Sequence, residues 1–135
     1  MLTCPALRSL RIVVPAAALA LALAMSGGTR AQGKKDVSVQ AHKYGYKVDA
    51  GGAEIRVQQD DLVRIAFSTE DIPHSFTMED DTYRIMRRAE PGRPVTFEFR
   101  ADKPGKFEFR CTLRADDRCK EMHGQLIVEP RKSPR

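Results

Sequence analysis

Residues 93–111 read RPVTFEFRADKPGKFEFRC, and this stretch decides the fold class. Apolar and polar side chains alternate from Val95 to Phe99 and again from Phe107 to Cys111, with a Pro-Gly pair between the two runs. A period of two is typical of a strand that is buried on one face, and Pro-Gly is a turn signal. The stretch therefore predicts two strands separated by a turn, with Cys111 facing inward at the end of the second.

The same kind of pattern continues on both sides of this stretch. Short alternating or apolar runs occur at residues 37–41, 61–68 and 125–128, and clusters of turn residues separate the runs along the chain. Several short runs at such spacing are typical of a β-sandwich or barrel. Residues 115–122 have room for one helical turn at most. The sequence therefore predicts an all-β domain.

Residues 1–31 have the order of regions found in a secretory signal peptide. Two arginines precede an unbroken apolar run at residues 12–25, and small residues then lead to a cleavage site that ends at Ala31. The apolar run is short for a membrane span. We expect cleavage, a periplasmic or secreted location, and a mature domain of residues 32–135 with an ordered core at about 37–129. The alternative is an uncleaved segment that anchors the protein in the membrane.

The charge of the chain gives little reason to expect a nucleic-acid partner. The full sequence has 23 Lys and Arg against 18 Asp and Glu, a net charge of +5. Three of the arginines and none of the acidic residues lie in residues 1–31, so the mature counts are 20 and 18 and the net charge falls to +2. This small excess is weak evidence for nucleic-acid binding. We also find no phosphate-binding glycine loop, nucleophile elbow or acid–base carboxylate pair, and therefore expect no enzyme activity.

The expected mature domain keeps two cysteines, Cys111 and Cys119, in a compartment where paired thiols tend to oxidise. One interpretation is a disulfide, which would close a short loop and contribute about 2–3 kcal/mol in the chain-entropy model. The other is a metal ion that holds both as thiolates. His74 shares its strand parity with Phe76 and so points toward the core, and a buried His and a buried Cys at two strand ends suit a metal site. Reduction of a disulfide would convert the first state into the second.

The loop CTLRADDRCKEMHGQLIV at residues 111–128 resembles the ligand loop of the cupredoxin family. The segment DIPHSF at residues 71–76 is similar to the family's segment with its first histidine ligand, and residues 90–111 are similar to its approach to the cysteine. The resemblance covers about residues 37–129. It implies a Greek-key β-sandwich or barrel with copper held by an upstream His, a Cys, a loop His and a weakly bound Met.

Carried over by position, His74, Cys111 and Met122 match the family's ligands, and the loop histidine is missing. The spacing from Cys111 to Met122 equals that in the binuclear copper domain of cytochrome oxidase subunit II, which has the pattern C-x3-C-x3-H-x2-M. In that register Ala115 stands in the place of the bridging cysteine and Cys119 in the place of the histidine. The resemblance therefore implies one copper ion rather than two.

The implied ligand set is one imidazole, two thiolates and one thioether, from His74, Cys111, Cys119 and Met122. Soft sulfur ligands favour Cu(I), and Zn(II) accepts the same donors. His123 is a less favoured substitute ligand, because strand alternation points it away from Met122. We expect a copper protein that passes electrons to a redox partner protein. The alternatives are a periplasmic Cu(I) carrier for oxidase assembly, and a disulfide-closed structural module without metal.

Overall fold

The computed structural model describes residues 32–49, 51–114 and 116–132. The predicted signal peptide at residues 1–31 lies outside these residues. The described part consists of nine β-strands and one short 3-10 helix, so the prediction of an all-β domain is confirmed. Within the same residues, no helix has the length and apolar character needed to cross a membrane.

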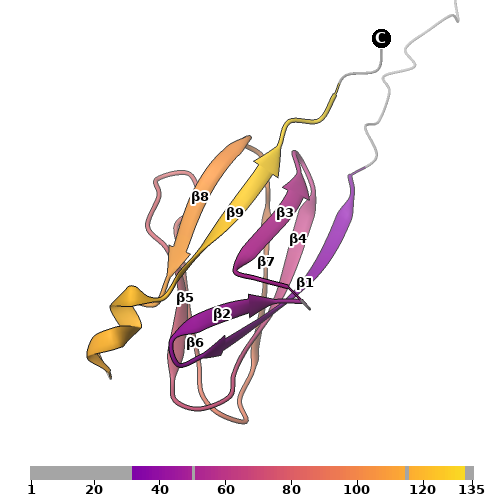
Figure 1. Ribbon diagram of the computed structural model, residues 1–135. Helices are drawn as coiled ribbons and strands as arrows, with labels where there is room; N and C mark the ends of the chain where they lie inside the picture. Colours follow the sequence, from indigo (N-terminus) through magenta and orange to yellow (C-terminus); the bar gives the residue numbers. More distant parts are fainter. Residues whose placement is uncertain (1–31, 50, 115, 133–135) are drawn as a thin grey trace, which may run out of the picture. The chain divides into compact units, whose positions relative to one another are not determined.

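The strands form two sheets that face each other (Figure 1). One sheet has four strands in the order β2-β1-β4-β7, with the bounds β2 Gly45–Val48, β1 Lys34–His42, β4 Leu62–Thr69 and β7 Val95–Arg100. The other has five strands in the order β3-β9-β8-β5-β6, with the bounds β3 Glu54–Gln58, β9 His123–Glu129, β8 Gly105–Arg110, β5 His74–Met78 and β6 Ile85–Ala89. The pairs β1–β4 and β3–β9 are parallel, and the remaining neighbours are antiparallel.

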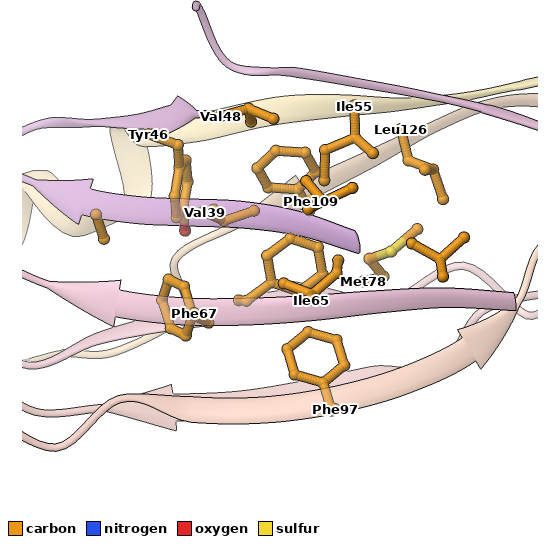
Figure 2. Close-up of a cluster of buried hydrophobic side chains, with 14 of the residues drawn as sticks. Val39, Tyr46, Val48, Ile55, Ile65, Phe67, Met78, Phe97, Phe109 and Leu126 are labelled. Carbon is orange, nitrogen blue, oxygen red and sulfur yellow. The ribbon is translucent and has the colours of Figure 1, made fainter. Parts of the chain in front are cut away.

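The core lies between the sheets and follows the predicted alternation, since every second residue is buried in β4 and in β1 from Val37 onward. Aromatic rings fill its centre, together with the aliphatic side chains shown in Figure 2. The ring of Phe76 stacks on that of Phe109, with centroids 4.6 Å apart, and lies 5.4 Å from that of Phe97. Such contacts add to the large apolar area that each ring buries. They fix β5, which begins with the candidate ligand His74, and β8, which ends directly before the candidate ligand Cys111.

Strand β5 departs from simple alternation, because all five of its residues are buried. Simple alternation would bury only the side chains that share the parity of His74 and Phe76. The segment after β8 covers the other face: the Thr112 N–H donates to Ser75 Oγ over 2.9 Å, and Thr112 Oγ1 lies 3.1 Å from Thr77 Oγ1. The hydroxyl groups on that face tolerate burial because they hydrogen-bond with one another.

Candidate metal centre

Three of the predicted ligands meet at one end of the sandwich. His74 is the first residue of β5, Cys111 directly follows β8, and Cys119 lies in the 3-10 helix η1 (Asp117–Glu121). Their nitrogen and sulfur atoms all lie within 4.8 Å of one another. His74 Nδ1 is 3.9 Å from Cys111 Sγ and 3.7 Å from Cys119 Sγ. The side chains are buried, with residue exposures of 0%, 1% and 0% respectively, so bulk water does not reach this cluster.

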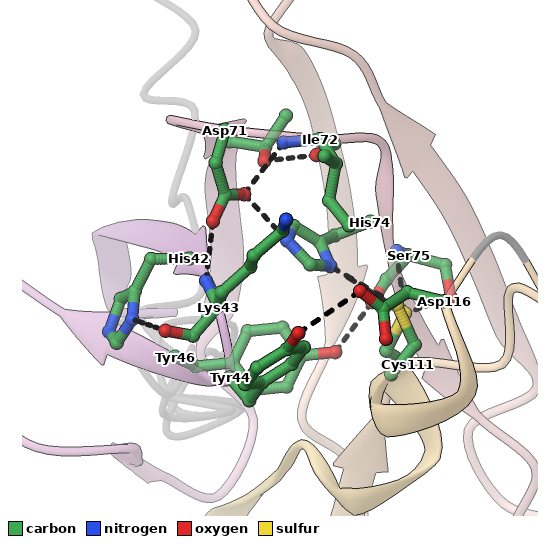
Figure 3. A network of polar contacts seen from close by, with 12 residues as sticks. His42, Lys43, Tyr44, Tyr46, Asp71, Ile72, His74, Ser75, Cys111 and Asp116 are labelled. Carbon is green, nitrogen blue, oxygen red and sulfur yellow. Dashed lines mark hydrogen bonds and ion pairs between the residues drawn. The ribbon is translucent and has the colours of Figure 1, made fainter.

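The orientation of His74 is set by Asp71 (Figure 3). His74 Nε2 lies 2.8 Å from Asp71 Oδ1, and the same carboxylate accepts hydrogen bonds from the backbone N–H groups of Ile72 (2.7 Å) and Lys43 (2.6 Å). Burial alone would raise the pKa of Asp71, but the hydrogen bonds from Ile72, His74 and Lys43 lower it overall. An ionised carboxylate only accepts, so we assign the imidazole proton to Nε2. Nδ1 then presents its lone pair toward the two sulfur atoms, as a metal-binding histidine does.

Both cysteines are free thiols in the structure, which therefore describes the reduced form of the site. Burial raises the pKa of Cys119 to about 11, and a hydrogen bond with Cys111 and the charge of that residue act in the same direction. Cys111 Sγ also accepts a hydrogen bond from the Ser75 N–H over 3.5 Å. A metal ion that binds both sulfur atoms must displace the Cys119 proton. The alternative disulfide would join the same two atoms, and it stays a prediction.

The last two candidate ligands, Met122 and His123, lie in different surroundings. Met122 is fully buried, its carbonyl accepts from the Cys111 N–H (3.2 Å) and its own N–H donates to the Cys119 carbonyl (3.0 Å). Its backbone therefore lies beside both cysteines, and its role as a weak ligand stays a prediction. His123 is exposed and its Nδ1 lies 3.0 Å from the Glu121 carbonyl, so it is not brought into the cluster.

The donor set fits copper. One imidazole lone pair and two sulfur atoms converge in a buried space, and soft donors of this kind favour Cu(I). The nearby carboxylate of Asp71 is bound to the far side of the imidazole, where it acts on the ligand rather than as one. Within the described residues, no buried side-chain nitrogen or oxygen lacks a hydrogen-bond partner, and the partners of His74 Nδ1 are the two sulfur atoms.

Sequence reasoning missed two parts of this site. Asp71 was noted only as part of a motif, although an aspartate three residues before a candidate ligand is a signal for a supporting hydrogen bond. Asp116 caps η1, because its side chain accepts from the Arg118 N–H. It also accepts a hydrogen bond from Tyr44 Oη over 3.1 Å, and no local pattern predicts a contact between residues 72 positions apart.

We predict that Asp71→Ala weakens copper binding by about 10- to 100-fold, the usual cost of losing a group that orients a metal ligand. The variant removes the acceptor for His74 Nε2, so the ring is free to rotate and to change tautomer. Competition with a Cu(I) chelator measures the affinity. Asp81→Ala removes a carboxylate whose side chain is 95% exposed and is the matched control. Equal affinities in the two variants would show that Asp71 does not orient the ligand.

Comparison with known proteins identifies the family and the fold. The family model described as cupredoxin-like domain matches residues 15–128. The copper-containing nitrite reductase of Neisseria meningitidis is 29% identical over 107 residues, which are 73% of this chain but only 28% of that protein.

Two solved structures show the same fold. One is a chain of a heme-copper terminal oxidase dimer solved by cryo-EM, with a TM-score of 0.64 and 22% identity over 75% of this chain and 67% of that one. The other is the periplasmic domain of cytochrome oxidase subunit II of Bradyrhizobium japonicum, with a TM-score of 0.58 and 18% identity over 71% of this chain and 84% of that one. The sandwich, the cluster at its end and the family match together show that this chain belongs to the cupredoxin-like domain family.

Proposed function

We propose that this chain is an exported protein that binds one copper ion through His74, Cys111 and Cys119, with Met122 as a weak fourth ligand, and that it passes electrons to a partner protein. The observation that carries the proposal is the convergence of one imidazole nitrogen and two sulfur atoms within 4.8 Å in a buried site. A bound copper ion would supply one-electron chemistry between Cu(I) and Cu(II).

The protein's own part is to hold the donors in place. The hydrogen bond that His74 donates to Asp71 fixes the imidazole, and the Ser75 N–H fixes the Cys111 sulfur atom. His74 and Cys111 lie at the ends of two strands whose rings, Phe76 and Phe109, stack on each other. A site held by a rigid core changes its geometry little between oxidation states, which favours electron transfer.

The kind of partner and the location are supported by the similar proteins. Two of them belong to terminal oxidases, and one of these is a periplasmic domain. We therefore propose a periplasmic or secreted location and a redox protein or a copper-accepting oxidase as partner. We propose no enzyme activity, because the candidate ligands His74, Cys111 and Cys119 are at most 1% exposed and leave no open face for a substrate.

One observation favours a second function. The site has two sulfur donors, whereas an imidazole in place of one of them would stabilise Cu(II). Two thiolates and a thioether favour Cu(I), which is the form that a copper carrier or store for oxidase assembly would handle. The two functions differ in whether Cu(II) is stable in the site and in how readily the metal leaves.

The test is an absorption and paramagnetic-resonance spectrum of the reduced protein after one equivalent of Cu(II) is added without oxygen. For electron transfer we expect intense visible thiolate-to-copper bands and a metal that stays bound through repeated reduction and oxidation. A colourless protein that binds Cu(I) tightly and gives it up to an acceptor would favour the carrier. Unchanged copper affinity in His74→Ala, or loss of the thiols to a disulfide with only loose copper, would leave a structural module and contradict both.

A further inference from the structure

The turn between β1 and β2 contacts both halves of the candidate site. We propose that Lys43 and Tyr44 form a clamp, which holds the imidazole side and the Cys119 side of the site in a fixed relation and keeps η1 closed over the buried sulfur atoms. Figure 3 shows the two contacts that start from these adjacent residues. The clamp rests on the same ligands as the proposed function, but the experiment below contains no metal and its result does not depend on copper binding.

The first arm runs through the backbone of Lys43. Its N–H donates to Asp71 Oδ2 over 2.6 Å, while Asp71 Oδ1 lies 2.8 Å from His74 Nε2. One oxygen of the Asp71 carboxylate thus binds the turn, and the other binds the imidazole of His74. A hydrogen bond to a charged acceptor is among the stronger ones in proteins. The position of the turn is therefore transmitted to the imidazole.

The second arm runs through the side chain of Tyr44. Its hydroxyl donates to Asp116 Oδ2 over 3.1 Å. Asp116 caps η1, because its Oδ1 accepts from the Arg118 N–H (2.9 Å) and its carbonyl accepts from the Cys119 N–H (3.0 Å). The Arg118 guanidinium also lies over the Tyr44 ring, 4.0 Å from its centre, which is within the range of a cation–π contact. Tyr44 therefore contacts both the start and the outer side of the turn that carries Cys119.

These contacts decide how Cys119 becomes accessible. The thiol is fully buried, so a reagent or a metal ion reaches it only when η1 moves away. A five-residue 3-10 helix has few bonds of its own, and its link to the β1–β2 turn is the contact with Tyr44. Local opening of such a segment does not require the sandwich to unfold. The clamp then sets the rate at which Cys119 is exposed.

The experiment measures the reaction of the reduced, metal-free, full-length protein with iodoacetamide, a neutral reagent, and mass spectrometry reports which cysteine is modified. Tyr44→Phe keeps the ring over Arg118 and loses only the hydroxyl group, so we expect Cys119 to react about tenfold faster, as for the loss of one hydrogen bond to a charged group. Tyr44→Ala loses both contacts and should react faster still. The modification of Cys119 should increase more than that of Cys111.

Tyr83→Phe is the matched control. It also removes one hydroxyl group, which donates to the Lys103 carbonyl and accepts from the Lys103 N–H, next to the start of β8 and away from the Cys111 end of that strand. A wild-type rate at Cys119 in both Tyr44 variants would overturn the proposal. It would also be overturned if Tyr83→Phe accelerated the reaction as much as Tyr44→Phe, or if the reactions of both cysteines were accelerated equally. Either result would mean that the whole domain had loosened and not η1 alone. If Tyr44→Ala does not fold, Tyr44→Phe still decides the matter.

Discussion

Cys111→Ser is expected to remove most of the visible thiolate-to-copper absorption and to weaken copper binding by more than about 100-fold. Loss of a supporting hydrogen bond alone costs roughly 10- to 100-fold in metal affinity, and the loss of a ligand exceeds it. Cys111 is the better placed of the two sulfur donors. It follows directly on β8, and its sulfur atom accepts from the Ser75 N–H. Cys119→Ser should therefore cost less, because Cys119 lies on the short helix η1.

Titration with Cu(I) in competition with a coloured chelator gives the affinities, and the spectrum of the Cu(II) form gives the bands. Met86→Ser is the control, because it also removes a sulfur atom, from a residue that is 65% exposed on β6. The interpretation of the site would be wrong if Cys111→Ser bound copper as tightly as Met86→Ser. Oxidised wild-type protein gives a second check: if it contains the Cys111–Cys119 disulfide, it should behave like the variant until it is reduced.

Strand parity alone placed two ligands correctly in the core. His74 shares its parity with Phe76, and Cys111 shares its parity with Phe109, and all four side chains are buried. This worked because a strand has a period of two whatever its neighbours are. The same rule failed for Ser75 and Thr77, whose burial depends on the segment after β8 lying over them. A pattern within one strand contains no information about a segment more than 30 residues away.

The residues that support the site could not be predicted from the sequence, for a similar reason. The sequence made Cys119 a candidate ligand through its pairing with Cys111 and through the spacing of a related loop. It did not predict that the adjacent residues Lys43 and Tyr44 contact Asp71 and Asp116, which are 28 and 72 positions away. These contacts require the β1–β2 turn to lie over the end of the sandwich, and only the tertiary fold determines that. The clustering of the candidate ligands was thus predictable from residue types and loop spacing, while the groups that contact them were not.

Gly124→Ala is expected to destabilise the folded protein by about 3 kcal/mol, at the upper end of the usual cost of overfilling a core. An added Cβ atom would overlap the ring of Phe109 and lie 2.7 Å from the carbonyl oxygen of Ala53. The ring cannot move freely because it stacks on Phe76, and the carbonyl belongs to the backbone and accepts a hydrogen bond from the Gln125 N–H. A loss of this size is a large part of the 5–15 kcal/mol that is typical of a domain.

Urea unfolding of the reduced protein measures this loss, and Gly52→Ala is the control. A Cβ atom at Gly52 meets nothing within 4 Å, so its cost should stay within about 0.5 kcal/mol. A second effect should accompany the first. Phe109 lies two residues before Cys111 and Gly124 two residues after Met122, on the paired strands β8 and β9. Pushing these strands apart moves Cys111 relative to η1, so Gly124→Ala should weaken copper binding even in the fraction that is folded. Wild-type stability in this variant would mean that the Phe109 ring moves more easily than its stacking on Phe76 implies, and the rigid support that the proposed electron transfer needs would be lost with it.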